Sequence, residues 1–437
     1  MAEIRPFCGI RYDQSKVGDM AAVICPPYDI ITPRMQQELY HQSQYNFVRV
    51  EFGRELPQDD DIDNKYTRAA ATLEQWLKQE ILLTEEKPAV YLHDHYFVYQ
   101  GQEYRRRGII VTVRLEEWSE AVIRPHEGTM TQPKGDRLNL LWALQANTSP
   151  IFTLFEDIDG QVSSLLVAQE RDEPVLEVGS AGGEGHRIRA VTDAGVVREI
   201  SRYLAGQPLY IADGHHRYES ALHYLRERQT CSGELAGNEP YHFVMMTLVP
   251  LDDPGLVVLP AHRLVRGMTR ITLSELRDKL KVFFDIEELP LPLPHVWEKV
   301  DAWRAEETDA VKLVLFGMDR ESVYLLTLRD FAAASKMMPY FHSEIYKRLD
   351  VSILDHVILE ELMGLRRDQE EVSLGYCYDR QEAVNKVREE EYQLAFLLSP
   401  VKTAVIKAIA DAGDRMPRKS TYFYPKLPSG LLCHRLV

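Results

Sequence analysis

The sequence predicts a mixed α/β (α+β) fold, because short β-rich runs alternate along the whole chain with segments of helical periodicity. Runs such as SPIFTLF and HFVMMTLVPL are typical of buried strands, whereas residues 66–78, 162–169 and 273–283 have the spacing of helices. With 437 residues, 45% hydrophobic and 27% charged, the chain is long enough for two or three domains with their own cores. We therefore expect a packed globular protein.

The elements group into three expected regions along the chain. Residues 1–120 form an N-terminal α/β region, in which two strand patterns joined by Gln100 and Gly101 predict a hairpin. Residues 121–265 form a core region with alternating strands and helices, and residues 266–437 form a C-terminal α/β region. The proline-punctuated connector LPLPLPH at 289–295 is the strongest local boundary signal.

Charge and cysteine usage limit the classes of partner and compartment. The net charge of −16 disfavours extended nucleic-acid or acidic-membrane binding, although a local cluster of Arg, Lys and backbone N–H groups can still bind a small anion. Five dispersed cysteines without a C-x-x-C pair predict reduced thiols, and no apolar run resembles a signal peptide or membrane span. The sequence predicts a cytoplasmic protein and leaves open whether it forms a homo-oligomer.

The strongest local motif is a strand, a sharp turn and a helix start at residues 209–222. An apolar strand pattern runs into Asp213 and Gly214, and a helix pattern follows at once. One face of the expected helix carries the apolar residues Tyr218, Ala221, Leu222 and Leu225. This pattern predicts a helix N-terminus placed directly at the end of a strand.

A helix N-terminus of this kind suits an anion, because its first N–H groups lie at the positive end of the helix dipole. Gly214 lets a ligand approach the backbone, Arg217 can bind phosphate oxygens, and His215 and His216 add donors. Asp213 is a candidate for binding a hydroxyl or a metal-bound water. The alternative is equally compatible with local physics: Asp213 only caps the helix, Gly214 only turns the chain, and the histidines lie on the surface.

A second motif, RPHEGTMTQPKGDRL at 124–138, places acid/base and cationic groups in a loop before a helix expected to start near Arg137. Glu127 is the candidate general base for a substrate hydroxyl, and a solvated loop carboxylate is the alternative. Further candidate contacts to substrate or phosphate are His126, Thr129, Lys134, Arg137 and, in the basic tail segment 417–425, Lys419. Surface ion pairing with Asp136 is an alternative role for Lys134 and Arg137.

Common nucleotide and hydrolase motifs are absent from the sequence. It contains no G-x-x-x-x-G-K-[ST] loop, no protein-kinase motifs, no G-x-G-x-x-G after a strand and no G-x-S-x-G elbow. Zinc binding through the adjacent pair His215 and His216 is disfavoured, since neighbouring side chains point apart and no further ligand has metal-site spacing. The sequence identifies no metal ligands.

The chain resembles, from end to end, the bacterial family called domain of unknown function 1015, also labelled SerK-like. The stretches that carry the resemblance are IRPFCGIRYD, CPPYDII, NFVRVE, RPHEGTMTQPKGDRLNLL, NTSPIF, LYIADGHHRYESAL, DDPGLVVLPAHRLV, QLAFLLSP and DAGDRMPRKSTYFYPKLPSGL. The DGHHR turn is similar to the phosphate-binding signature of the ParB/sulfiredoxin superfamily, which includes archaeal free-serine kinases. The resemblance implies a ParB/sulfiredoxin-like core with flanking α/β layers.

By this resemblance, Asp213 to Arg217 are the phosphate-binding and catalytic turn and Glu127 is the base. The implied function is transfer of a phosphoryl group to the hydroxyl of free L-serine, or of a similar hydroxy metabolite, to give O-phosphoserine. The implied donor is ATP, ADP or pyrophosphate, accompanied by Mg²⁺. Two alternatives stay open: a non-catalytic nucleotide-sensing module, and a structural interaction protein in which the DGHHR turn merely caps a helix.

Overall fold

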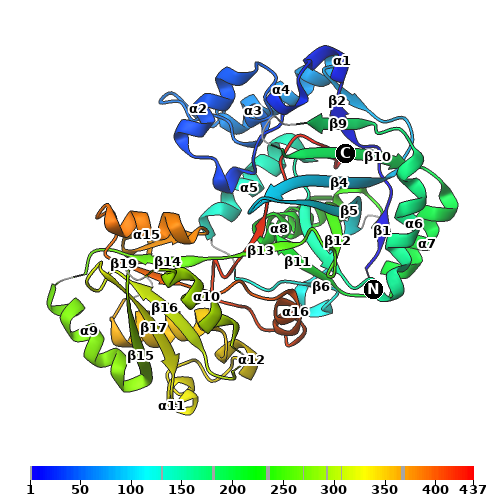
Figure 1. Cartoon of the computed structure of the whole chain (residues 1–437). Helices are drawn as coiled ribbons and strands as arrows, with labels where there is room; N and C mark the ends of the chain where they lie inside the picture. Colours follow the sequence, from blue (N-terminus) through cyan, green and yellow to red (C-terminus); the bar gives the residue numbers. More distant parts are fainter. Residues whose placement is uncertain are drawn as a thin grey trace. The chain divides into compact units, whose positions relative to one another are not determined.

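A computed structural model describes residues 2–128, 131–179, 183–232, 237–268, 270–291, 294–306, 308–365 and 370–437 (Figure 1). The chain divides into two compact units. The first unit comprises Met1–Pro125, Thr129–Val257 and Pro425–Val437, and the second comprises His126–Gly128 and Val258–Tyr424. Both units combine sheets with helices, so the predicted mixed α/β class is confirmed.

A nine-stranded mixed sheet forms the centre of the first unit. Its order is β6-β11-β8-β12-β5-β4-β10-β9, with β1 paired to β5. Strand β12 runs parallel to β8 and antiparallel to β5, while β11 runs parallel to β6. The strands are β1 (Ile4–Arg5), β4 (Val90–Tyr99), β5 (Gln102–Arg114), β6 (Ile123–Arg124), β8 (Ile151–Phe155), β9 (Leu176–Gly179), β10 (Gly185–Val191), β11 (Leu209–Asp213) and β12 (Phe243–Pro250).

The two faces of this sheet pack against different groups of helices. Because side chains alternate along a strand, Ile109, Val111 and Val113 of β5 enter one hydrophobic cluster and Ile110 enters another. The first cluster includes buried residues of α6 (Gln161–Ala168), α7 (Ala194–Leu204) and α8 (His215–Ser232). The second includes residues of α2 (Pro33–Gln42), α3 (Val48–Glu51) and α4 (Lys65–Lys78), and α5 (Thr131–Leu144) contributes to both.

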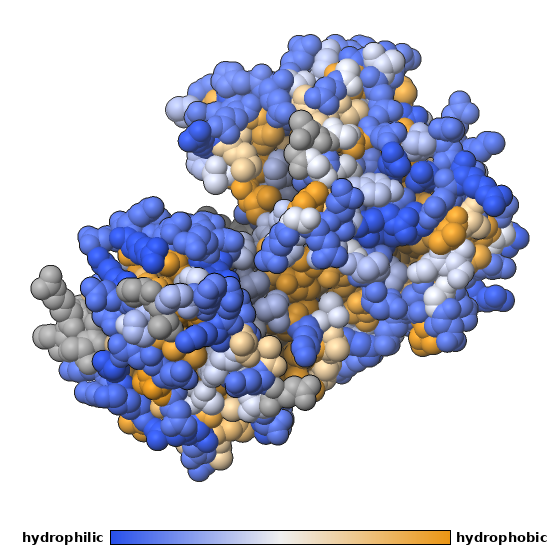
Figure 2. All heavy atoms as spheres, viewed as in Figure 1, coloured by the Kyte–Doolittle hydropathy of each residue, from blue (hydrophilic) through white to orange (hydrophobic). Residues whose placement is uncertain are grey.

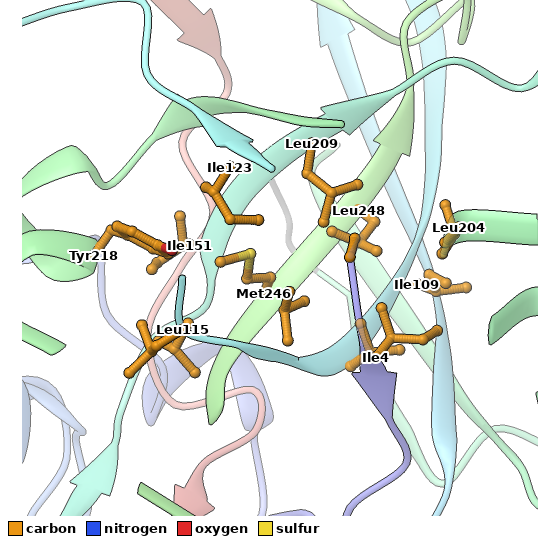
Figure 3. Packing of buried hydrophobic residues seen from close by; sticks show 14 of the residues in the cluster. Ile4, Ile109, Leu115, Ile123, Ile151, Leu204, Leu209, Tyr218, Met246 and Leu248 are labelled. Carbon is orange, nitrogen blue, oxygen red and sulfur yellow. The ribbon is translucent and has the colours of Figure 1, made fainter. Parts of the chain in front are cut away.

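Helix α8 is held on the sheet by the apolar face that its sequence predicts. Tyr218, Ala221, Leu222 and Leu225 are all buried in the first cluster. Figure 3 labels Tyr218 and Ile151 of β8 among the residues of this cluster. This packing fixes the first turn of α8 at the end of β11.

Two further predictions rest on local signals, and the structure confirms both. Strands β4 and β5 form the expected hairpin, with Tyr99 opposite Gln102. Gln100 and Gly101 have φ values of 50° and 78°, the left-handed conformation that a two-residue hairpin turn requires. The helix expected at 66–78 is α4.

Three small two-stranded sheets complete the pairing. They join β2 (Ile10–Tyr12) to β3 (Leu82–Thr84), β7 (Ala146–Asn147) to β21 (His434–Arg435), and β13 (Val257–Pro260) to β20 (Thr421–Tyr424). The pairing of β21 with β7 returns the C-terminal segment to the first unit.

The second unit is built on a six-stranded sheet of order β15-β17-β16-β19-β14-β18. Its strands are β14 (His262–Val265), β15 (Phe284–Pro290), β16 (Lys312–Phe316), β17 (Ser322–Leu328), β18 (Leu374–Cys377) and β19 (Leu394–Leu397). Its longer helices are α9 (Arg270–Phe283), α10 (Val296–Ala305), α15 (Arg380–Arg388), α16 (Thr403–Asp411) and the π-helix η7 (Ile353–Leu362), with α12 (Glu344–Lys347) as a short turn.

The units do not follow the boundaries predicted at 120/121 and 265/266. Strands from 1–120 and from 121–265 are neighbours in one sheet. This sheet forms by pairing between distant segments, which local sequence patterns do not reveal. The connector at 289–295 falls in the second unit, where Leu289 and Pro290 end β15 and α10 begins at Val296. Helix α5 begins at Thr131 rather than near Arg137. Most of the surface visible in Figure 2 is hydrophilic, and none of the described helices is long and apolar enough to cross a membrane.

We expect Gly108→Ala to destabilise the first unit. A Cβ at Gly108 would lie 2.6 Å from the backbone oxygen of Leu248 and 2.7 Å from Val249 Cγ2, in the middle of the sheet. Overpacking of this kind costs about 1–3 kcal/mol, to be measured by urea unfolding. Gly179→Ala is the matched control, because nothing lies within 4 Å of its Cβ position. Equal stability of the two variants would contradict the packing described for β5.

Candidate functional site

The Asp213 corner, residues 213–217, is the point at which β11 ends and α8 begins. Gly214 has a φ of +94°, and a Cβ there would lie 2.9 Å from both Nε and Nη2 of Arg217. The intrahelical hydrogen bonds begin with Tyr218 N donating to Gly214 O at 3.1 Å, so the preceding amides lie at the positive end of the helix dipole. The corner therefore needs glycine both for its backbone angle and for the close approach of Arg217.

Two cations neutralise the carboxylate of Asp213. Arg217 Nη2 donates to Asp213 Oδ2 at 2.8 Å, and Lys426 Nζ forms an ion pair with Oδ1. Burial alone would raise the pKa of Asp213, but Lys426 and Arg217 lower it to about 2. The carboxylate is thus ionised at neutral pH and is a poor proton acceptor.

Arg217 also ties the corner to the segment before β8. Its Nη1 donates to Ser149 Oγ at 3.1 Å and to the backbone oxygen of Pro150. Its Nε is buried and has no hydrogen-bond partner among the described residues. A buried N–H without an acceptor is costly, so the corner retains one donor suited to an anionic ligand.

The two histidines of the corner differ in exposure. His215 is buried, and its charge when protonated contributes to the lowered pKa of Asp213, whereas His216 is half-buried. Both are located at the first turn of α8, as the sequence predicts.

A cavity of about 40 Å³, here called the Arg137 cavity, adjoins the corner. It is lined by Arg137, Arg217, Ser149 and Glu51, among others. Arg137 is buried, lies 4.1 Å over the ring of Tyr28, and donates from Nη1 to the backbone oxygen of Glu51 at 3.0 Å. The structure therefore brings the predicted residues Arg137 and Arg217 to one cavity.

Arg106 supports the C-terminal segment that carries Lys426. Its fully buried Nη2 donates to the backbone oxygen of Pro425 at 2.7 Å and contacts His95 Nδ1 at 2.9 Å. Burial lowers the pKa of Arg106 to about 10, which still leaves a cation at neutral pH. This hydrogen bond holds the backbone at Pro425, directly before Lys426, in place.

His95, Glu184 and His186 are a group whose ligand atoms all lie within 4.8 Å of one another. The contact of Arg106 Nη2 with His95 Nδ1 places the proton of neutral His95 on Nε2, which donates to Glu184 Oε1 at 2.9 Å. A ligating imidazole needs the lone pair of that nitrogen, and its other N–H usually meets an acceptor. Since Arg106 is a donor, these residues fit a hydrogen-bonded network better than a metal ion.

Mg²⁺ is the metal that the family resemblance implies, and the corner fits it poorly. Each oxygen of Asp213 is already paired with a cation, so an Mg²⁺ ion bound there would displace Lys426 or Arg217. Octahedral Mg²⁺ is often held by substrate phosphates and water with few protein ligands. Mg²⁺ at the corner would accordingly arrive with the donor phosphates.

Glu127 belongs to the second unit, where its carboxylate is held by the tail segment. Oε1 of Glu127 accepts hydrogen bonds from Ser420 N at 3.1 Å, Thr421 N at 3.0 Å and Thr421 Oγ1 at 2.9 Å. His126 is fully buried, and its Nε2 lies 2.9 Å from Thr421 Oγ1. The structure thus places Glu127 and His126 beside Ser420 and Thr421, at the start of β20.

The remaining predicted contacts have mixed outcomes. Lys419 lies in the second unit with a φ of 56°, and its backbone oxygen accepts from Arg263 Nη1 at 2.7 Å. Thr129 lies outside the described residues, and the side chain of Lys134 lies outside the described part of α5. These roles stay predictions.

Sequence reasoning missed several residues around the corner and its cavity. Lys426 is 213 positions from Asp213, and no local pattern links the two. The signal that could have found them is the set of family-like stretches: CPPYDII contains Tyr28, NFVRVE contains Glu51, NTSPIF contains Ser149, and the tail stretch contains Lys426.

Comparison with known proteins places the chain in a family. Residues 4–352 match the family described as "Protein of unknown function (DUF1015)", and the chain belongs to that family. Of the curated proteins, none matches the sequence.

Solved structures with a detectable likeness are distant. A conserved hypothetical protein from Pyrococcus furiosus is 13% identical, with 74% of this chain and 93% of that chain covered and a TM-score of 0.34. A free serine kinase in complex with AMP is 11% identical, with 72% and 86% covered and a TM-score of 0.33. SbnI with C-terminal truncation from Staphylococcus aureus is 10% identical, with 73% and 84% covered and a TM-score of 0.32. None of these likenesses assigns an activity to this chain.

The lowered pKa of Asp213 predicts a particular dependence of stability on pH. Because its pKa falls from an ordinary 3.8 to about 2 on folding, the carboxylate stabilises the fold above about pH 4, and this contribution disappears as pH falls through 2. We expect the free energy of unfolding of the wild type to be about 2 kcal/mol higher than that of Asp213→Asn at pH 6. Near pH 2 the two free energies should become similar. Thermal unfolding of both proteins across this range tests the prediction. A pH-independent difference would contradict it.

Proposed function

We propose that the protein is a cytoplasmic phosphotransferase that transfers a phosphoryl group to the hydroxyl of free L-serine or a similar hydroxy metabolite. The observation that carries the proposal is the Asp213 corner: a helix N-terminus beside two cations, with the buried Nε of Arg217 lacking a partner among the described residues. Such a corner offers a phosphate both positive charge and hydrogen-bond donors. The similarity of the DGHHR stretch to free-serine kinases supports serine as the acceptor.

In this proposal, Gly214, His215, His216 and Arg217 hold the transferring phosphoryl group. Asp213 orients Arg217 and the acceptor hydroxyl, a role that suits a carboxylate whose pKa is about 2 better than proton abstraction does. Phosphoryl transfer asks a protein mainly for positioning and charge neutralisation. The corner supplies both.

Glu127 is the proposed general base, which accepts the proton of the acceptor hydroxyl. Support comes from the family resemblance and from the fixed orientation of the carboxylate, which three hydrogen bonds from Ser420 and Thr421 hold in place. His126, Thr129, Lys134, Arg137 and Lys419 stay proposed contacts to substrate or phosphate. Mg²⁺ is proposed to accompany an ATP, ADP or pyrophosphate donor and to neutralise part of the phosphate charge.

A non-catalytic nucleotide-sensing module is the second candidate. The observation that favours it is that both Asp213 oxygens are paired with cations, one with Lys426 and one with Arg217. In a sensing module, Asp213 stabilises the nucleotide-binding corner through these ion pairs. Binding without transfer then uses the corner alone.

The first experiment separates these candidates. ATP, ADP and pyrophosphate, each with Mg²⁺, are added to the protein, and the melting temperature is recorded. Each donor is then incubated with L-serine, and O-phosphoserine is measured by mass spectrometry. A thermal shift with product supports the kinase, a shift without product from any hydroxy metabolite supports the sensing module, and no shift with any donor excludes both.

For the kinase, Glu127→Gln and Asp213→Asn should each lower turnover at least about a hundredfold. The first removes the proton acceptor, and the second removes the charge that orients Arg217. Turnover is measured as O-phosphoserine formed under saturating donor and serine. Glu298→Gln is the matched control, because Glu298 is an exposed carboxylate of α10, and it should keep wild-type turnover. Wild-type turnover in either test variant would exclude that residue's role.

A further inference from the structure

The second unit contains a cavity of about 410 Å³, here called the His356 pocket, which the proposed function does not use. Its size falls in the range of sites for small metabolites. The lining includes His342, Tyr346 of α12, Asp355, His356 and Glu360 of η7, and Arg415. His356 and Glu360 lie beyond residues 4–352, the part that matches the family.

A buried chain of hydrogen bonds runs along one side of this pocket. Tyr346 OH lies 2.8 Å from His356 Nε2, and His356 Nδ1 lies 2.8 Å from Glu360 Oε2. A carboxylate can only accept from Nδ1–H, so the neutral imidazole presents the Nε2 lone pair to the Tyr346 hydroxyl. Tyr346 is 3% and His356 4% exposed. The arrangement polarises a phenol hydroxyl at the pocket wall.

A second imidazole and carboxylate pair brackets the same phenol. His342 Nδ1 lies 2.7 Å from Asp414 Oδ1, and the His342 ring stacks on the Tyr346 ring with centroids 3.6 Å apart and planes 6° apart. Asp414 Oδ2 also accepts from Ser343 N at 2.8 Å. Two imidazole and carboxylate pairs therefore contact one phenol at the pocket wall.

The backbone of η7 is itself unusual. Residues Ile353–Leu362 form a π-helix, a rare conformation that is frequent at functional sites. It carries Asp355, which pairs with the fully buried Arg263 at 3.3 Å, in addition to His356 and Glu360. Three polar residues of one short π-helix therefore line the pocket.

The side of the pocket formed by residues 415–418, just before β20, is cationic. Arg415 and Arg418 line it. The segment is anchored by Arg263, whose Nη2 donates to Arg418 O at 3.0 Å and whose Nη1 donates to Lys419 O at 2.7 Å. Arginine on one side and a polarised hydroxyl with carboxylates on the other match a ligand that is anionic at one end and a hydrogen-bonding donor at the other.

We infer that the His356 pocket binds a small carboxylic acid that carries a hydroxyl or amino group. Arg415 and Arg418 bind its carboxylate, and Tyr346 and Asp355 bind its hydroxyl or ammonium group. The inference concerns the second unit alone and does not depend on phosphoryl transfer at the Asp213 corner.

Isothermal titration calorimetry of the full chain tests the inference, with L-serine, L-lactate and D-glycerate as probes and acetate and ATP as comparisons. At least one of the three probes should bind, more tightly than acetate. Tyr346→Phe should weaken that binding about tenfold, since it removes one hydrogen bond in a buried site. Arg415→Gln should weaken it at least tenfold through loss of the charge-assisted contact.

Tyr340→Phe is the matched control, because Tyr340 is 92% exposed and lies in the same segment, and it should leave binding unchanged. Weaker binding in Tyr346→Phe and Arg415→Gln assigns the binding to this pocket, because neither residue belongs to the proposed kinase site. Tyr346→Phe must melt as the wild type does, and Glu360→Gln provides a second variant that alters the chain of hydrogen bonds. Absence of binding by all three probes, or unchanged binding in both Tyr346→Phe and Arg415→Gln, would overturn the inference.

Discussion

The first unit depends on the neutralisation of one half-buried carboxylate. Asp213 sits where β11 passes into α8, and an unpaired charge there would carry a desolvation penalty of several kcal/mol. Arg217 supplies one cation from the next turn of the helix, and Lys426 supplies the other from the C-terminal segment. The same contacts fold Arg217 over Gly214 and hold its guanidinium against the segment before β8. The Asp213 side chain therefore connects the end of β11, the first turn of α8 and the C-terminal segment.

Around this carboxylate, segments that are far apart in the sequence share one cavity. Glu51 is the last residue of α3, Arg137 lies in α5, Ser149 precedes β8 and Arg217 lies in the first turn of α8. The buried Glu51 carboxylate accepts hydrogen bonds from Arg137 and Thr148, so its negative charge is paired with the positive charge of Arg137 in the cavity wall. Each of these residues belongs to a stretch by which the chain resembles its family. These stretches, although far apart in the sequence, therefore line the same cavity.

What the sequence could predict depends on how locally each feature is determined. The hairpin at Gln100 and Gly101 and the buried face of α8 follow from turn conformation and helical periodicity, and both are confirmed. The nine-stranded sheet depends on pairing between residues more than a hundred positions apart, as with Ile110 and Thr247, and local patterns carry no such information. For the same reason the Asp213 corner was predictable from its own residues, whereas Lys426 was not. The π-helix η7 has an apolar helical pattern, which does not distinguish the two kinds of helix.

The discontinuity of the first unit has a consequence for biosynthesis. Its last segment, Pro425–Val437, is synthesised only after all of Val258–Tyr424. Until that segment leaves the ribosome, Asp213 lacks Lys426, Arg106 lacks the Pro425 carbonyl, and β7 lacks its partner β21. The second unit is thus complete in the nascent chain before the first, and the Asp213 corner closes only after the whole of the second unit has been synthesised.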